Sequence, residues 1–167
     1  SFNAFSSIDY PETAVFRDMR LIPFLRRPDP MPPVQFYEQL DPAVFVLRLV
    51  PGMRADIIPL LAPHYRALVV ESFGVGGLPG GEHGEMYARL QDWCASGRLA
   101  VFTTQVPHEG CDLAVYEVGR SVKELPGVLE ARDMTPVAVK LMWALGQTND
   151  RTEAMRLFTT PVEWDIV

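Results

Sequence analysis

Residues 67–81 read ALVVESFGVGGLPGG, an apolar run that leads directly into a glycine-rich loop. A short continuous apolar run such as 67–70 is typical of a central parallel strand covered on both faces. Glu71 and Ser72 fall where this strand would end, and in an open α/β sheet ligands gather at the carboxyl ends of strands. Glycines there let the backbone turn sharply and lie close to a ligand or a neighbouring subunit.

The spacing of these glycines is not specific for a nucleotide. A G-x-G-x-x-G fingerprint begun at Gly74 needs a glycine where Pro79 stands, so the dinucleotide-binding motif is excluded. On spacing alone, a connecting loop that needs glycine for its backbone conformation is the simpler interpretation.

The composition favours one soluble globular domain. The chain has 167 residues, of which 48% are hydrophobic and 22% charged, enough for a sizeable core but short for two domains. A net charge of −6 argues against nucleic acid and against an anionic membrane surface as partners. No apolar run approaches the ~20 residues of a membrane span, and residues 1–10 do not resemble a signal peptide.

The cysteines and histidines indicate no metal or cofactor. Cys94 and Cys111 match no metal-ligand spacing, and although they could form one disulfide, a reduced cytoplasmic protein is the simpler expectation. Cys111, in an expected loop, could be a reactive thiol, but its neighbours are not basic enough to favour the thiolate. The three histidines share no ligand spacing either.

Residues 1–42 differ from the rest of the chain. Their prolines forbid a long helix and break any strand into short pieces, so we expect a proline-rich linker arm. Residues 13–24 could hold a short strand or a hairpin, and 26–30 read as a turn-rich linker.

Residues 43–167 show the regular pattern of an α/β domain. Strands are expected at 44–50, 67–70, 99–103 and 127–129, and helices at 55–61, 85–96, 114–125, 135–146 and 150–158. Thr135 would cap the fourth helix with Pro136 at its first position, Gly146 would end it, and Asp150 would cap the fifth. This alternation predicts a small open parallel sheet of about four strands with helices on both faces, flavodoxin-like or Rossmann-like.

Polar residues follow the strand expected at 99–103. Thr103, Thr104 and Gln105 could hydrogen-bond a small polar ligand at a carboxyl strand end, although a plain polar terminus is the simpler alternative. The chain contains no convincing set of nucleophile, base and orienting residue, so we expect no catalytic residue in it.

Four stretches together resemble the C-terminal domain of the L-asparaginase family, especially its cytoplasmic bacterial type. They are residues 46–53 (VLRLVPGM), 67–79, 104–119 and 127–146, and the resemblance covers about residues 43–158. It implies that the chain is about half of an amidohydrolase that converts L-asparagine, or L-glutamine, to the acid and ammonia without metal or cofactor.

The resemblance also implies that catalysis and active-site closure belong to different domains. In the family, the nucleophilic threonine and the residues that activate it lie in an N-terminal catalytic domain, and no T-G-G-T-like or H-G-T-D-T-like motif occurs here. A threonine hydroxyl is a weak nucleophile without a base, so this chain alone should be inactive. Its expected roles are formation of a homodimer and closure of an active site through Glu71, Ser72, Gly74, Gly76, Gly77, Thr104, Gln105 and Tyr116.

Two alternatives remain open. The stretch 140–150 also resembles the asparaginase-like component of the archaeal amidotransferase that corrects misacylated glutamine tRNA. The other alternative, from a different functional class, is a stand-alone small-ligand-binding or interaction domain. The proline-rich arm speaks against it because that arm looks like a linker from a preceding domain.

The final segment, residues 159–167 (TTPVEWDIV), departs from the family's usual ending. Trp164 and Ile166 would either cover a partner surface or tuck onto the domain itself.

Members of the cytoplasmic type bind asparagine at a separate activating site, and the resemblance places an arginine of that site where this chain has Glu71. A carboxylate there would repel the carboxylate of the ligand, so we expect the activating site to be absent. Titration of the chain with L-asparagine in a calorimeter should then give no heat of binding. Asparagine bound in contact with Glu71 would contradict this expectation.

Overall fold

The computed structural model describes residues 11–25, 33–80, 84–162 and 165–166. The chain divides into two compact units, Ser1–Tyr37 and Glu38–Val167. Within the first unit, β1 (Ala14–Arg17) and β2 (Arg20–Pro23) form an antiparallel hairpin. Asp18 and Met19 connect them with φ angles of 49° and 62°, as a two-residue type I′ turn requires. The linker expected at 26–30 lies outside the described residues.

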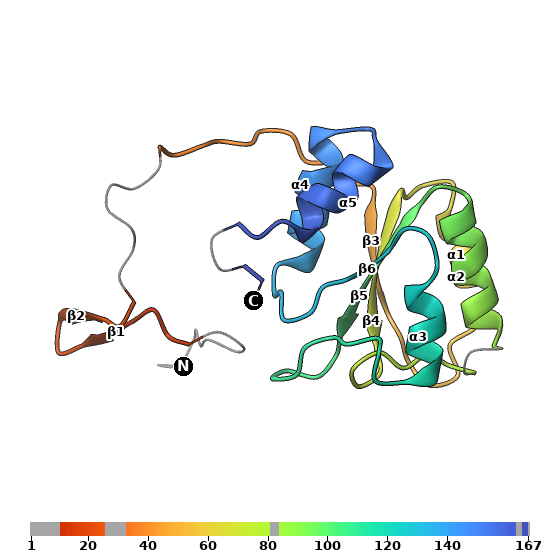
Figure 1. The fold of residues 1–167 in the computed structure, drawn as a ribbon, viewed down its shortest axis with the longest axis horizontal. Helices are drawn as coiled ribbons and strands as arrows, with labels where there is room; N and C mark the ends of the chain where they lie inside the picture. Colours follow the sequence, from red (N-terminus) through yellow and green to blue (C-terminus); the bar gives the residue numbers. More distant parts are fainter. Residues whose placement is uncertain (1–10, 26–32, 81–83, 163–164, 167) are drawn as a thin grey trace. The chain divides into compact units, whose positions relative to one another are not determined.

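The second unit is built on a four-stranded parallel sheet (Figure 1). Its strands are β3 (Val44–Arg48), β4 (Ala67–Ser72), β5 (Leu99–Thr104) and β6 (Val128–Glu130), and they lie side by side in chain order. The predicted four-stranded parallel sheet is thus confirmed. β4 and β5 are buried along most of their length, because helices cover both faces of the sheet.

The helices are distributed by the handedness of their connections. α1 (Ile57–Leu61), α2 (Glu85–Ala95) and α3 (Glu117–Lys123) each link two neighbouring parallel strands and cover one face. Right-handed crossovers between strands in sequential order place all their helices on the same side. α4 (Val137–Gln147) and α5 (Arg151–Thr159) follow β6 and cover the opposite face, as Figure 1 shows.

Each face of the sheet has its own hydrophobic core. Because side chains alternate along a strand, Leu68 and Val70 of β4 face α1 and α2, whereas Ala67 and Val69 face α4 and α5. The first core also holds Ile58, Met86, Leu90, Trp93 and Phe102, and the second holds Val101, Leu141, Ala144, Leu145 and Phe158. Cys94 is fully buried in the first core, as its place on the apolar face of its helix predicts.

Two local predictions for α4 are wrong. The helix begins at Val137 with Pro136 as its N-cap, and Pro136 has a ψ of 42° outside the helical range, so Thr135 provides no cap. Gly146 lies inside α4 and does not end it. A Cβ at Gly146 would collide with the backbone carbonyl of Gln39, so the glycine allows residues 39–40 to pass close to the helix. The helix ends at Gln147 because Thr148 is extended, with φ −154° and ψ 152°.

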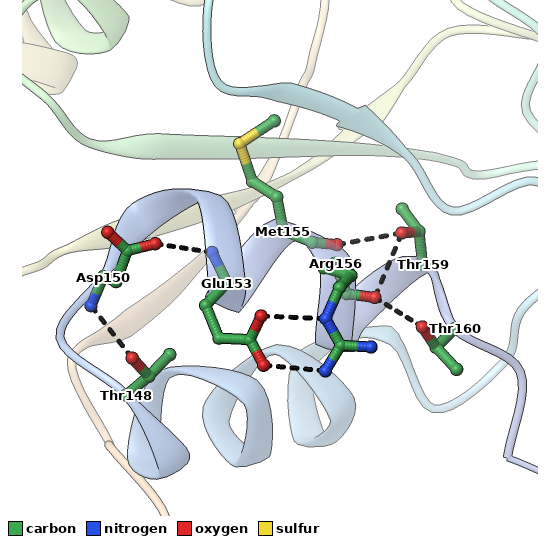
Figure 2. Close-up of polar contacts among 7 residues, drawn as sticks. All are labelled: Thr148, Asp150, Glu153, Met155, Arg156, Thr159 and Thr160. Atoms are coloured by element: carbon green, nitrogen blue, oxygen red, sulfur yellow. Dashed lines mark hydrogen bonds and ion pairs between the residues drawn. The ribbon is translucent and has the colours of Figure 1, made fainter.

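Side chains cap both ends of α5 (Figure 2). The Asp150 carboxylate accepts a hydrogen bond from the amide of Glu153 at 2.7 Å, which confirms the predicted cap. The Thr148 hydroxyl accepts one from the amide of Asp150 at 3.0 Å. At the other end, the Thr160 hydroxyl donates to the carbonyl of Arg156 at 2.7 Å. The bonds at the amino end satisfy amides that an isolated helix end leaves unpaired, and the Thr160 hydroxyl adds to the bond that the Arg156 carbonyl already accepts from the Thr160 amide.

The segment before β3 belongs to the α/β unit. The amide of Asp41 donates to the carbonyl of Met142 at 2.9 Å, and the Gln147 side chain donates to the carbonyl of Gln39 at 2.9 Å. The Asp41 carboxylate also pairs with Arg66 at 2.6 Å. The boundary between the units therefore falls after Tyr37, five residues earlier than the arm of residues 1–42 would place it.

The C-terminal tail folds back onto α4 through a buried ion pair. The Lys140 ammonium lies 2.7 Å from the Asp165 carboxylate and donates to the carbonyl of Thr160 at 2.8 Å. The Lys140 side chain is only 4% exposed and that of Asp165 18%. Ile166 is buried in the core beneath α4 and α5, so this part of the tail tucks onto its own domain, and Trp164 lies outside the described residues.

Replacing Asp165 by alanine should destabilise the domain by about 3 kcal/mol, because the buried Lys140 charge would lose its partner. Lys140→Met should cost less, since the more exposed Asp165 can rehydrate. The double variant should be more stable than Asp165→Ala alone. Urea unfolding measures all three, with Arg54→Gln, which breaks an exposed pair with Asp56, as a control that should leave the midpoint unchanged. If Asp165→Ala unfolded at the same urea concentration as the control, the Lys140–Asp165 ion pair would not stabilise the domain.

Candidate functional site

Parallel pairing brings the polar strand ends to one edge of the sheet. The register places Arg48, Glu71 and Thr103 side by side on β3, β4 and β5, and Ser72 beside Thr104. Gln105 follows directly and its amide donates to the carbonyl of Ser72 at 3.3 Å. The candidate residues 71–72 and 103–105, separated by about thirty positions in the chain, therefore lie together.

Glu71 and Ser72 point to opposite faces of the sheet, because successive side chains of a strand alternate. Glu71 lies on the face of α4 and α5, where its carboxylate is 3.8 Å from the Arg48 guanidinium. Its side chain remains 29% exposed. A cation inside a strand needs either an exposed edge position or a paired carboxylate, and Arg48 has both.

The hydroxyls of Ser72 and Thr104 hold the backbone of the edge. Ser72 is fully buried and donates to the carbonyl of Thr103 at 2.8 Å. Thr104 donates to the carbonyl of Gly74 and accepts from the amide of Val106 at 3.0 Å. Both hydroxyl protons are therefore already used by backbone oxygens, which leaves neither group as an activated nucleophile.

Gln105 joins three strand ends. Its side-chain nitrogen donates to the carbonyl of Leu49, beyond β3, at 2.7 Å and to the carbonyl of Glu71, in β4, at 2.8 Å. Both amide hydrogens are used, so the side chain acts as a clamp across the edge.

The glycine loop is closed on itself. The amide of Phe73 donates to the carbonyl of Gly77 at 3.1 Å, and the amide of Gly77 donates back to Phe73 at 2.7 Å. Gly74 has a φ of 50°, in the left-handed region that favours glycine. A Cβ at Gly76 would lie 3.0 Å from the Leu113 side chain, so the loop packs closely on the segment before α3.

Tyr116 covers the loop from the side. Its hydroxyl would lie 3.4 Å from a Cβ at Gly74, and the two residues line an open hollow of about 470 Å³ together with Phe73, Gly77 and Leu78. The Tyr116 side chain is about half exposed, and within the described part of the chain its hydroxyl makes no hydrogen bond. The exposed Tyr116 hydroxyl and the partly exposed Glu71 carboxylate are therefore accessible to a molecule from outside.

Sequence reasoning missed Glu130, which anchors the segment under the loop. Its carboxylate accepts from the amide of Leu113 at 2.7 Å and pairs with Lys123 at 2.9 Å. The amide of the preceding residue, Asp112, donates to the carbonyl of Val75 at 3.0 Å. No local pattern identifies this role, because the partners of Glu130 lie in other segments.

Cys111 is buried in the same segment and is not a reactive thiol. Burial, and next the charge of Glu130, raises the pKa of the thiol to about 12. Burial likewise raises the pKa of Cys94 to about 11. Both thiols therefore stay protonated at neutral pH, where a nucleophilic cysteine would need to ionise. Both are free, with no disulfide between them.

The described residues contain no group of three or more histidine, cysteine, aspartate or glutamate side chains arranged to hold a metal ion. In the same part of the chain, no helix has the length and apolar character needed to cross a membrane.

Residues 43–158 match the family model described as the glutaminase/asparaginase C-terminal domain. The chain belongs to this family. An L-asparaginase from Thermococcus kodakarensis is 35% identical over 170 residues, which cover 98% of this chain and 50% of that relative. A component of the glutamyl-tRNA(Gln) amidotransferase from Metallosphaera sedula is 34% identical over 167 residues, covering 95% of this chain and 36% of its own length.

Solved structures agree with this assignment. The thermostable L-asparaginase from Thermococcus kodakarensis superimposes with a TM-score of 0.89 at 32% identity, covering 100% of this chain and 51% of that one. L-asparaginase I from Vibrio cholerae gives 0.82 at 22% identity, covering 98% and 50%, and supports the fold alone. This asparaginase-type domain thus spans about half the length, or less, of the relatives it matches.

Replacing Gln105 by methionine should remove the clamp across the edge. We expect a loss of about 1–3 kcal/mol, toward the lower value because the Glu71 carbonyl keeps its bond from the Leu49 amide. Hydrogen exchange of the amides in residues 71–77 should accelerate more than that of α2. The matched control is Gln91→Met on the exposed side of α2. Equal exchange at the loop in both variants would contradict the role of Gln105.

Proposed function

We propose that this chain is the C-terminal half of an L-asparaginase-like amidohydrolase and completes the active site of a homodimer. The parent reaction is hydrolysis of L-asparagine, or L-glutamine, to the acid and ammonia, without metal or cofactor. The observation that carries the proposal is the carboxyl edge of the sheet, where Tyr116 and the glycine loop line an open hollow and the Glu71 carboxylate remains partly exposed.

The architecture of the sheet supports an active site that is completed by another domain or a second copy of the chain. Open α/β sheets bind ligands where the strand order reverses, because the connections diverge there and leave a crevice. This sheet runs in sequential order from β3 to β6, so it has no such reversal. The exposed apolar residues Val106, Val115 and Tyr116 lie at the same edge and suit contact with an N-terminal catalytic domain or a second copy of the chain.

The chemistry of the edge supports the view that the nucleophile lies outside this chain. The Ser72 and Thr104 hydroxyls donate to carbonyls, and burial keeps the Cys111 thiol protonated. The candidate residues of this edge would then shape and close the active site without providing its nucleophile. They are Glu71, Ser72, Gly74, Gly76, Gly77, Thr104, Gln105 and Tyr116. We propose a cytoplasmic location, in line with two unpaired, buried cysteines and a structural neighbour named as a probable cytoplasmic L-asparaginase.

A second candidate rests on the amidotransferase relatives. The component of the Metallosphaera sedula glutamyl-tRNA(Gln) amidotransferase is nearly as similar as the L-asparaginase. The net charge of −6 argues mildly against direct contact with tRNA, which could still contact other parts of such an assembly. Co-purification of the chain with a partner protein or with tRNA would favour this candidate. A stand-alone binding domain would instead bind its ligand without either partner.

The deciding measurement is ammonia release from L-asparagine and L-glutamine by the purified chain. We expect none from the chain alone and turnover after an N-terminal half, such as that of the Thermococcus kodakarensis relative, is added. Tyr116→Ala should reduce the restored turnover at least tenfold, because it removes one side of the hollow. Val139→Ala, on the exposed face of α4, is the matched control.

Ammonia release by the chain alone would overturn the proposal. It would require a nucleophile within these residues, and Thr103, Thr104 and Cys111 would be the first positions to replace.

A further inference from the structure

A second cavity lies at the opposite, amino edge of the sheet. It has a volume of about 350 Å³ and lies where α1 and α2 end, β4 and β5 begin, and α4 turns into α5. Three arginines from three different segments line it. Arg66 directly precedes β4, Arg98 directly precedes β5, and Arg151 is the first residue of α5.

The cavity carries an excess of positive charge. Asp150 is the only acidic residue among the described ones that line it, and its carboxylate already accepts from the amide of Glu153 at 2.7 Å. Arg66 is paired with Asp41 at 2.6 Å. Arg98 and Arg151 have no carboxylate partner in the described part of the chain. In a protein of net charge −6, two such guanidinium groups beside one cavity indicate an anionic ligand.

The contacts of Arg98 show how it is held in place. It donates to the carbonyl of Ala62 at 2.7 Å and to that of Tyr65 at 3.2 Å, and its guanidinium lies 5.2 Å from the Trp93 ring. Ala62 is the C-cap of α1 and Tyr65 lies in the segment that leads to β4, so Arg98 holds the end of α1 to the start of β5. The positive charge is thus fixed at the cavity by neutral acceptors, which a bound anion can supplement.

Arg151 is a second arginine whose donors could bind an anion in the cavity. Its guanidinium donates to the carbonyl of Pro126 and lies against Gly127, where a side chain would collide with it. Its Nε is buried and has no hydrogen-bond partner among the described residues. The contact with Pro126 occupies one of the five guanidinium N–H groups, so other N–H groups of this cavity-lining arginine remain for an anion.

We propose that this cavity binds a small phosphate group, either inorganic phosphate or the phosphate of a small metabolite. Guanidinium groups match the geometry of phosphate oxygens and remain charged at all physiological pH values. Donors from three segments suit the tetrahedral oxygens of a phosphate better than the two coplanar oxygens of a carboxylate. The amino end of α5, nine residues long, adds partial positive charge, and His64 adds a further ring nitrogen to the lining.

Calorimetry with inorganic phosphate at constant ionic strength tests the proposal directly. The unmodified chain should bind phosphate, and Arg66→Gln and Arg151→Gln should each weaken the binding about tenfold or more. Arg54→Gln, an exposed arginine paired with Asp56 away from the cavity lining, should bind as the unmodified chain does. Circular dichroism should show that each variant is folded.

A measurement on the unmodified chain removes the dependence on variants. Phosphate should shift the amide resonances of Gly97, Arg98 and Arg151 and leave those of Gly74 and Gly77 unchanged. Three results would each overturn the proposal: no binding, equal binding by all variants, or shifts at the glycine loop instead. Tighter binding of malonate than of phosphate would also overturn it, because the site would then select carboxylates. Binding of a phosphomonoester with affinity above that of inorganic phosphate would identify a metabolite as the source.

Discussion

The structure depends on the pairing of β4 with β3 on one side and β5 on the other. This pairing makes β4 a central strand, and its alternating side chains then enter the two cores on the two faces of the sheet. All backbone bonds of β4 are satisfied by neighbours, so a fully apolar run can be buried without unpaired polar groups. The same pairing aligns the ends of three strands and thereby creates the edge on which the glycine loop rests.

That edge is rigid because its polar groups bind one another. Ser72, Thr104 and Gln105 each donate to backbone carbonyls of this edge, and the loop of residues 73–77 is closed by its own amides. Such a surface loses little conformational entropy when a partner or substrate meets it, which favours preorganised contact. The cost is chemical: hydroxyls that hold the backbone are not available as nucleophiles. An edge that is rigid but provides no nucleophile is consistent with the proposed role, in which this domain closes an active site whose catalytic residues lie in another domain.

Much of the fold could be predicted from the sequence, because most elements follow from neighbouring residues. The four strands, the Asp150 cap and the buried Cys94 follow from periodicity and cap preferences that neighbours in the chain determine. The prediction that Gly146 ends α4 is wrong because the same local rules take no account of distant segments. Gly146 is needed for the approach of the Gln39 backbone, a contact between residues more than one hundred positions apart.

The candidate site shows the same limit. Glu71, Ser72, Thr104 and Gln105 could be placed at strand ends from apolar runs alone, but the acceptors of Gln105 lie 56 and 34 residues earlier in the chain. Glu130 and Arg151 carry no local signal, because each acts through contacts with other segments.

The sequence by itself determined the family, the alternation of strands and helices, and the absence of the family's threonine motifs, because these are properties of consecutive residues. Only the tertiary structure decided which polar groups at the carboxyl edge are occupied and which arginines gather at the amino edge. The physical reason is that a hydrogen bond or an ion pair acts over a few ångströms in space, whatever the separation of its partners along the chain.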